Sequence, residues 1–187
     1  VGADLCATQE AIDFIQEVPE KLPFMATSCC PAWSMMAKKL FPEHADCISM
    51  ALTPMTLTAR LIKRHHSNAK VVFIGPCAAK KLEAMRTDIR SDVDFVLTFE
   101  EMDGIFNARH VDVEKIEEDP EGVNDASMDG RNFAVAGGVA KSVVDVIHER
   151  YPDKEIKVAN AEGLKECRKL LTMAKAGKYN GYLLEGM

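Results

Sequence analysis

Two short segments of the chain carry residue types that can do chemistry. The first is "TSCCPAW", Thr27–Trp33, in which adjacent cysteines are followed at once by a proline. Neighbouring cysteines rarely bond to each other, because the ring that such a disulfide closes is strained, and their side chains tend to diverge. The two thiols are therefore expected to have different partners.

The second segment is "GPCAAKKLEA", Gly75–Ala84, in which Cys77, Lys80 and Glu83 recur at intervals of three. On a helix these side chains share one face, and both the helix start and the lysine favour a thiolate. A cubane iron–sulfur cluster takes four thiolates, and Cys30 and Cys77 are the two that can be nominated. The residues alone leave open a cysteine-ligated metal site, a reactive thiol, or a surface Lys–Glu helix with a buried cysteine.

The rest of the chain alternates between strand-like and helix-like segments. Helical spacing is expected in 5–18, in 31–41 with Pro31 at its start, and in 53–65 with Thr53 as its cap. Strands are expected in 23–27, 71–74, at the start of 94–110, in 132–136, and at both ends of 155–187. This alternation predicts an α/β fold with mostly parallel sheets flanked by helices.

In such folds, sites gather at the carboxyl ends of the strands. Cys29 and Cys30 follow one expected strand, Cys77 follows the next, and Glu185 and Met187 lie at the end of the last. The acidic segment 111–130 is expected to connect two α/β sub-domains, 1–110 and 131–187.

Composition narrows the class of protein. The chain has 187 residues and a net charge of −6 with no basic tract, which argues against a nucleic-acid partner. No apolar run approaches the roughly 18 residues of a membrane helix, and no basic leader precedes the first helix, so a cytoplasmic location is expected. The six cysteines include no Cys-x-x-Cys pair, and Cys6, Cys47 and Cys167 are expected to be small buried hydrophobes.

Together, "TSCCPAW" and "GPCAAKKLEA" resemble the first two signature motifs of the [FeFe]-hydrogenase (iron-only hydrogenase) large-subunit catalytic domain, T-S-C-C-P-x-W and x-P-C-x-x-K-x-x-E. "GADLCATQEA" and "FAVAGGVAKSVVD" also resemble family segments. The third family motif begins E-x-M and then supplies two more cysteines, whereas this chain reads "LLEGM" and stops at Met187. The resemblance therefore implies a fragment, inactive alone, of a longer parent protein.

The resemblance implies that the parent reversibly reduces protons to H2 at a [4Fe–4S] cluster joined to a di-iron subsite with carbon monoxide and cyanide ligands. By position, Cys30 and Cys77 are two of the cluster's four thiolate ligands. Lys80 would face a cyanide ligand, Glu83 would support that region, and Met187 would pack near the di-iron unit.

The resemblance also implies a proton relay and a set of partners. Cys29 matches the relay cysteine, and Glu10, Ser49 and Asp13 match further relay positions. The implied partners are ferredoxin or another low-potential electron carrier, cluster maturation proteins, and the remaining segments of the parent chain. A hydrogenase-like iron–sulfur assembly protein, or a sensor of H2 or redox state, is the alternative; such relatives tend to lack the full double cysteine that this chain retains.

Overall fold

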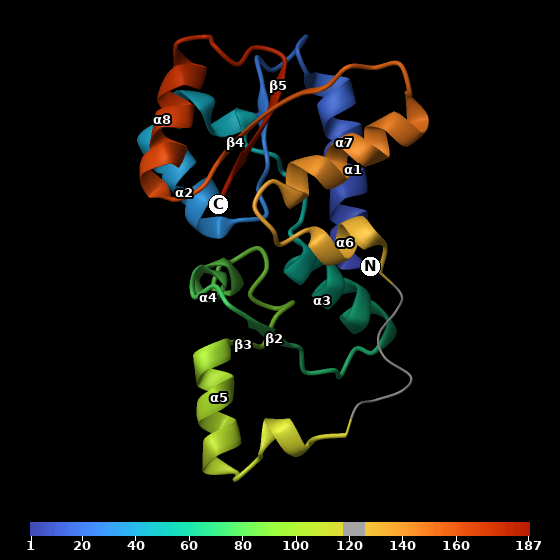
Figure 1. Ribbon diagram of the computed structural model, residues 1–187, viewed down its shortest axis with the longest axis vertical. Coiled ribbons are helices and arrows are strands. Elements are labelled where there is room, and N and C mark those ends of the chain that lie inside the picture. Colours follow the sequence, from blue (N-terminus) through green and yellow to red (C-terminus); the bar gives the residue numbers. More distant parts are fainter. Residues whose placement is uncertain (118–125) are drawn as a thin grey trace. The chain divides into compact units, whose positions relative to one another are not determined.

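The computed structural model describes residues 1–117 and 126–187. Its strands pair in parallel and are flanked by helices (Figure 1), which confirms the predicted α/β class. The strands are β1 Met25–Ala26, β2 Val72–Gly75, β3 Phe95–Thr98, β4 Lys157–Ala161 and β5 Tyr182–Gly186. The helices are α1 Gly2–Glu17, α2 Pro31–Leu40, α3 Pro54–His65, α4 Ala79–Ala84, α5 Phe99–Ala108, α6 Met128–Asn132, α7 Gly138–Arg150 and α8 Leu164–Lys175, with short 3-10 helices at Pro42–Cys47 and Val113–Lys115. None of the helices within the described residues has the length and apolar character needed to cross a membrane.

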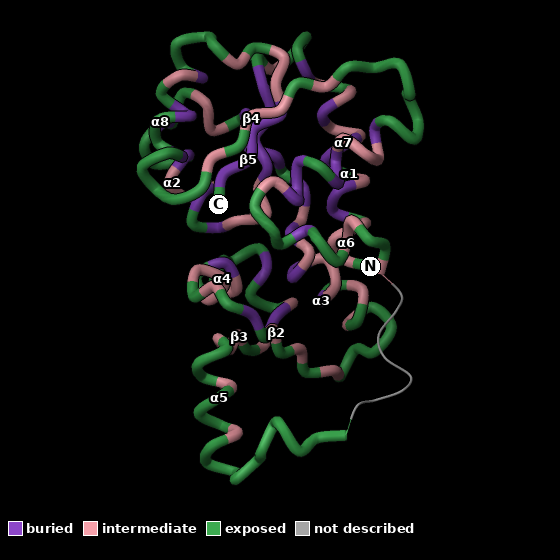
Figure 2. Tube along the Cα trace, viewed as in Figure 1, coloured by how far each residue is buried: buried purple, intermediate pink, exposed green. Residues whose placement is uncertain are grey.

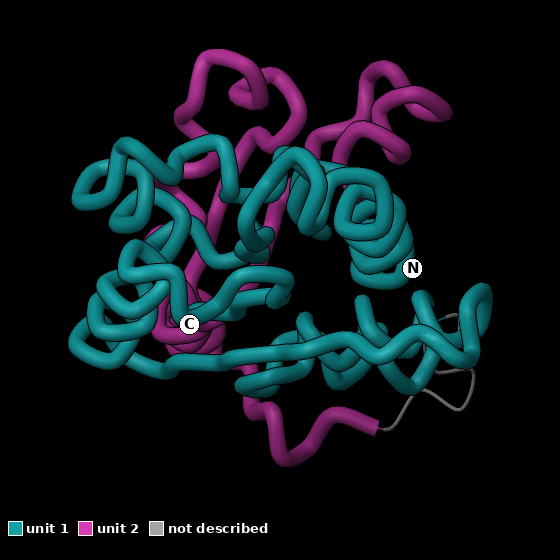
Figure 3. Tube along the Cα trace, turned by 90° about the horizontal axis from the view of Figure 1, so that it is seen from above, with its two compact units in different colours: residues 1–57, 126–187 teal, residues 58–125 magenta. Residues whose placement is uncertain are grey.

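Contacts group the chain into two compact units (Figure 3), one formed by 1–57 together with 126–187 and the other by 58–125. The larger unit thus joins both ends of the chain. The expected sub-domains 1–110 and 131–187 follow the chain linearly and stay a prediction. Part of the expected connection, 118–125, lies outside the described residues.

The larger unit is built on a three-stranded parallel sheet with the order β1-β5-β4. Met25 pairs with Leu183 and Ala26 with Leu184, so the short β1 lies beside the last strand of the chain. β5 is almost entirely buried (Figure 2), as expected for the central strand of a parallel sheet.

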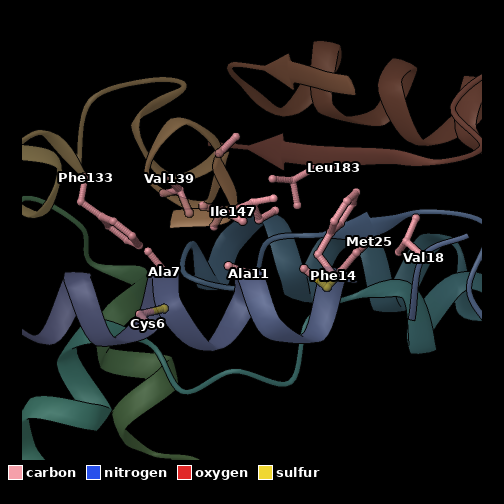
Figure 4. Close-up of a cluster of buried hydrophobic side chains, with 12 residues drawn as sticks. Cys6, Ala7, Ala11, Phe14, Val18, Met25, Phe133, Val139, Ile147 and Leu183 are labelled. Carbon is pink, nitrogen blue, oxygen red and sulfur yellow. The ribbon is translucent and has the colours of Figure 1, made fainter. Parts of the chain in front are cut away.

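Alternation along the strands divides the core into two clusters. Met25 and Leu183 belong to a cluster with α1 and α7 (Figure 4), whereas Ala26 and Leu184 belong to a cluster with α2 and α8. Successive strand residues point to opposite faces, so a two-residue strand is enough to serve both clusters. The cysteines expected to be buried, Cys6, Cys47 and Cys167, are buried within these clusters.

Helix starts follow the predicted local chemistry. Pro31 stands at the start of α2, where a missing N–H costs nothing. Before α3, the Thr53 hydroxyl accepts a hydrogen bond from the Thr56 N–H at 3.4 Å. Thr98 and Glu101 form a reciprocal capping box at the start of α5, satisfying two N–H groups that the helix cannot.

The strand expected in 132–136 is wrong. α6 ends at Asn132, and turns lead directly to α7: the Val135 N–H donates to the Asn132 carbonyl at 3.1 Å, and the Gly138 N–H donates to the Val135 carbonyl at 2.7 Å. Val135 is 61% exposed, so the apolar letters that suggested a buried strand do not form one. The predicted Gly-Gly turn and the helix after it are confirmed, and Gly137 takes a φ of 79° that suits glycine.

The smaller unit contains the parallel pair β2–β3, in register from Val72 opposite Phe95 to Gly75 opposite Thr98. Asp94, which directly precedes β3, is bonded to the segment that leads into β2. Its carboxylate accepts a hydrogen bond from the Val71 N–H at 2.9 Å and forms ion pairs with Lys63 at 2.7 Å and Lys70 at 3.1 Å. The Lys63 contact, with these other bonds, lowers the pKa of Asp94 well below its usual range.

A matched pair of glycine substitutions tests the turn before α7. A Cβ at Gly138 would lie 2.2 Å from the Asn132 carbonyl oxygen, whereas a Cβ at Gly104, inside α5, meets nothing within 4 Å. We expect Gly138→Ala to lower the free energy of unfolding by about 1–3 kcal/mol, because backbone must move. Gly104→Ala should be neutral or stabilise by up to about 1 kcal/mol. Chemical denaturation of both variants measures this, and equal effects would contradict the packing argument.

Candidate functional site

The "TSCCPAW" segment lies between β1 and α2 and is fixed at its first residue. The Thr27 N–H donates to the Leu184 carbonyl at 2.9 Å, which extends the β1–β5 pairing by one bond. The Thr27 carbonyl accepts a hydrogen bond from the Trp33 indole N–H at 3.0 Å, and Trp33 is buried. Trp33 is therefore the packing anchor that the sequence predicts, and it closes the loop that carries both cysteines.

Cys29 and Cys30 have different surroundings. Cys29 packs against the α1–α7 cluster, and Cys30 packs against the α2–α8 cluster. Both are half-buried, as is Cys77, and all three are free of disulfides. The expectation that the two adjacent thiols diverge is met by their packing on separate clusters.

The three remaining cysteines differ from the motif cysteines. Cys6, Cys47 and Cys167 are buried, and burial raises the pKa of the Cys47 and Cys167 thiols. A raised thiol pKa reduces the thiolate that could bind a metal. In this chain, the half-buried thiols are thus the ones that the motifs single out.

Glu10 is fully buried in α1, and one side of its carboxylate reaches the cysteine loop. The Ser28 N–H donates to Glu10 Oε1 at 3.2 Å, while Oε2 has no hydrogen-bond partner among the described residues. Burial raises the pKa of Glu10 to about 7; the Ser28 N–H and the Ser49 hydroxyl act against this rise, and the charges of Asp13 and Glu185 add to it. Glu10 can therefore gain or lose a proton near neutral pH.

Ser49 joins this site from a different part of the chain. Its N–H donates to the Ala26 carbonyl at 2.8 Å, so the segment after Cys47 runs alongside β1. The Ser49 hydroxyl accepts a hydrogen bond from the Ala51 N–H at 3.1 Å, and the Ser28 hydroxyl donates to the Ala51 carbonyl at 3.1 Å. These bonds hold the Ser49 segment against the cysteine loop, and the Ser49 hydroxyl acts to lower the pKa of Glu10.

Asp13 lies one helical turn from Glu10 and is half-buried. Its Oδ1 accepts a hydrogen bond from Gln9 Nε2 at 2.8 Å. Gln9 and Asp13 both line a cavity of about 570 Å³, together with Met50 and Leu52. Glu10, Ser49, Asp13 and the cysteine loop are thus brought together within the larger unit, with the acids running from a buried to a partly exposed position.

Cys77, Lys80 and Glu83 lie in the smaller unit. The Lys80 N–H donates to the Cys77 carbonyl at 3.2 Å, which places Cys77 just before α4. Lys80 Nζ lies 2.7 Å from Glu83 Oε2, with 12% of the Lys80 side chain and 2% of the Glu83 side chain exposed. A solvated surface pair is therefore the wrong interpretation of this helix, because the lysine is held by a buried carboxylate.

Glu185 and Met187 lie at the carboxyl end of β5. Glu185 is buried and accepts hydrogen bonds from the Gly137 N–H at 3.1 Å and the Ala140 N–H at 2.7 Å. Met187 is 36% exposed and borders, with Glu185, Gly137 and Asn160, a cavity of about 200 Å³. Burial raises the pKa of Glu185, and these N–H groups oppose the rise.

Sequence reasoning did not give roles to Ser28 or Glu185. Ser28 is inside the quoted first motif, but its contribution is a backbone N–H, which a side-chain pattern does not report. Glu185 is visible as a lone acid in the apolar text "YLLEG", and a charged residue in a buried strand is a signal that it must have partners.

Among the described residues, no group of three or more His, Cys, Asp or Glu side chains is arranged to hold a metal ion. Cys30 lies in the larger unit and Cys77 in the smaller one. The two cysteines expected as iron ligands, Cys30 and Cys77, are thus both half-buried and belong to different units.

The whole chain, residues 1–187, matches the family described as "Iron only hydrogenase large subunit, C-terminal domain". The chain belongs to this family. It is 27% identical to iron hydrogenase 1 of Clostridium pasteurianum and 26% identical to the periplasmic [Fe] hydrogenase large subunit of Nitratidesulfovibrio vulgaris, in each case over 99% of this chain. It covers 35% and 54% of the length of those two relatives.

A solved [FeFe]-hydrogenase structure matches with a TM-score of 0.76 at 21% identity, over 100% of this chain and 66% of that one. At this identity the match establishes the fold. A shorter part of the chain, 43%, is 33% identical to the cytosolic Fe-S cluster assembly factor NAR1 of Kluyveromyces lactis and covers 17% of that protein.

The raised pKa of Glu10 predicts a dependence of stability on pH. The carboxyl shifts from its ordinary value of 4.5 when unfolded to about 7 when folded, so the folded state holds the extra proton between these values. The free energy of unfolding should therefore fall as pH rises through this window, by about 3 kcal/mol in all. Thermal unfolding across the window measures it.

Glu10→Gln should make the free energy of unfolding depend less on pH in this window, because the amide that replaces the buried acid does not titrate. Glu20→Gln, at an exposed carboxylate, is the control and should leave the slope unchanged. A Glu10→Gln protein that keeps the wild-type slope would show that other groups produce it.

Removing Lys80 tests the buried ion pair of α4. In Lys80→Met the Glu83 carboxylate, which is buried, loses the ammonium at 2.7 Å. We expect a loss on the order of 3 kcal/mol in the free energy of unfolding. Lys81→Met is the matched control, since Lys81 pairs with the exposed Glu101, and should cost less than about 1 kcal/mol. Equal losses would mean that burial of Glu83 does not govern the pair.

Proposed function

We propose that this domain belongs to an [FeFe]-hydrogenase that catalyses the reversible reduction of protons to H2, using electrons from ferredoxin or a similar low-potential carrier. The observation that carries the proposal is a buried carboxyl, Glu10, whose pKa is about 7 and whose partner Ser28 directly precedes the double cysteine. A proton-reducing site needs such a group between solvent and the reacting metal.

Cys30 and Cys77 would hold the [4Fe–4S] cluster. Both thiols are half-buried and outside disulfides, which suits the donor chemistry of iron–sulfur ligation. When bound, the cluster and its di-iron subsite would pass on the carrier's electrons and supply the metal at which protons are reduced. Two thiolates do not complete a cubane, so further segments of the polypeptide would supply the other ligands. Maturation proteins would deliver the cluster. The 187-residue chain alone is therefore proposed to be inactive.

Lys80 would present its ammonium to a cyanide ligand of the subsite. The Glu83 carboxylate at 2.7 Å keeps the lysine in place without needing solvent. An ammonium already oriented in a partly buried position attracts an anion more strongly than a mobile surface lysine does. Met187 would supply an apolar, polarisable contact beside the same group.

The proton would travel through residues of the larger unit. Asp13, at the cavity that Gln9 and Met50 also line, would take it from solvent. Ser49 would pass it to Glu10, which can hold or release a proton near neutral pH, and Glu10 would exchange it with the Cys29 thiol. The packing of the two cysteines on separate clusters supports a proposal in which Cys29 would carry the proton and Cys30 would bind the iron.

The alternative function is that of a protein that binds iron but does not catalyse the hydrogen reaction. The match of part of this chain to a cytosolic Fe-S cluster assembly factor supports that alternative, and a sensor of H2 or redox state has the same requirement for bound iron. Full-length protein that binds iron through Cys30 and Cys77, yet neither makes nor consumes H2, would favour it.

A cytoplasmic location is part of the hydrogenase proposal, and fractionation of cells tests it against the periplasm named for one relative.

Replacing Cys29 tests the relay. Cys29→Ser in the full-length, matured protein should lower H2 turnover by at least ~100-fold, because a serine hydroxyl does not release its proton near neutral pH. Iron content should stay at the wild-type level. Cys30→Ser should instead lower iron content.

Cys47→Ser, at a buried cysteine outside the site, is the control and should change neither iron content nor turnover beyond what stability explains. Full activity in Cys29→Ser, measured by gas chromatography of H2, would refute the relay role.

A further inference from the structure

Glu185 is a buried acid that the proton route above does not use. It lies in the central strand β5, with 1% of its surface exposed. Oε1 accepts from the Gly137 N–H at 3.1 Å and Oε2 from the Ala140 N–H at 2.7 Å, so both carboxylate oxygens are bound to the start of α7. One side chain thus ties the last strand to a helix that begins 47 residues earlier, at Gly138.

The register of the sheet brings Glu185 towards the Glu10 site. Ala26 is paired with Leu184, and the Thr27 N–H donates to the Leu184 carbonyl at 2.9 Å. Glu185 therefore stands level with Thr27, next to Ser28, whose N–H donates to Glu10 at 3.2 Å. The register thus places Glu185 on the strand beside the loop that binds Glu10, and its charge is among those that raise the pKa of Glu10.

α7 also meets α1 directly. Ala140, which donates to Glu185, is fully buried in the same cluster as Ala7 and Ala11 of α1, the neighbours of Glu10 along that helix. A small residue at each contact lets the helices approach closely. A shift in the first turn of α7 would therefore change the packing against the helix that carries Glu10.

We propose that Glu185 is a positioning residue for Glu10: its carboxylate holds the first turn of α7 in place against α1 and keeps a second buried acid beside the loop that binds Glu10. The catalytic consequence rests on the proposed function, but the effect on Glu10 does not.

The groups that face Glu10 give the sign of the effect. Asp13 on its own helix and Glu185 on β5 disfavour the charged form, while the Ser28 N–H and the Ser49 hydroxyl favour it. Removing the charge of Glu185 leaves the other three unchanged. The Glu10 carboxyl should then lose its proton at lower pH.

The test measures the protonation of Glu10 in the full-length protein by infrared difference spectroscopy, with the acid carbonyl band assigned by its loss in Glu10→Gln. In Glu185→Gln the band should disappear at lower pH than in wild type. In Glu185→Asp, which keeps the charge on a shorter side chain but no longer holds α7 as well, the midpoint should shift less than in Glu185→Gln. Amide hydrogen exchange at Ala140 should be faster in both variants.

Ser142→Ala is the matched control. Its hydroxyl is buried in the same part of α7 and donates to the Gly138 carbonyl at 2.7 Å, but it carries no charge. This variant should leave the Glu10 midpoint unchanged. An unmoved midpoint in Glu185→Gln, or an equal shift in Ser142→Ala, would overturn the proposal.

If Glu185→Gln does not fold, the reverse measurement decides, because coupling between two sites is reciprocal. In Glu10→Gln the acid band of Glu185 should disappear at lower pH than in wild type, and no shift there would overturn the proposal.

Assays of H2 keep the two proposals separate. A wild-type protein without H2 turnover whose Glu10 band still responds to Glu185 refutes the hydrogenase function alone; turnover with an unresponsive band refutes the positioning role alone.

Discussion

The pairing of β1 with β5 is the contact on which the larger unit depends. β1 has two residues, yet its register with Leu183 and Leu184 places the cysteine loop beside the last strand of the chain. Its two side chains serve the two hydrophobic clusters, one on each face of the sheet. Within the larger unit, Glu10, Ser49 and Glu185 come from different segments and are bonded to, or are part of, this short parallel pair and the loop that follows it.

Burial then gives these polar residues their chemistry. Glu10 would be an ordinary surface acid on an isolated amphipathic helix, but the packing of α1 against α7 and the sheet removes it from water. Only one of its oxygens accepts a hydrogen bond from a backbone N–H, so the hydrogen bonds that the carboxylate would make to water are only partly replaced. Glu83, in the smaller unit, is also a buried carboxylate, but there the Lys80 ammonium stabilises its charged form.

Much of this arrangement is predictable from the sequence, and the parts that are not share a cause. Helix starts at Pro31 and Thr53 and the strand–helix–strand order of 155–187 follow from local rules, and so does the parallel α/β class. The strand expected in 132–136 does not form, because apolar residues there do not lead to burial: Val135 is exposed, and the backbone hydrogen bonds close within turns. The roles of Ser28 and Glu185 depend on which strands are neighbours, and a pairing between residues 26 and 184 has no local signal.

The divergence of Cys29 and Cys30 has a consequence for how such a loop can evolve. Adjacent residues here pack on clusters that lie on opposite sides of one sheet. A deletion or insertion of a single residue in this loop would move both thiols relative to its two anchors, the Thr27 bond to Leu184 and the Trp33 bond to Thr27. Substitutions in the loop change one chemical group at a time, whereas a change in its length would displace both thiols together. The loop is therefore constrained first in its length and only second in its composition.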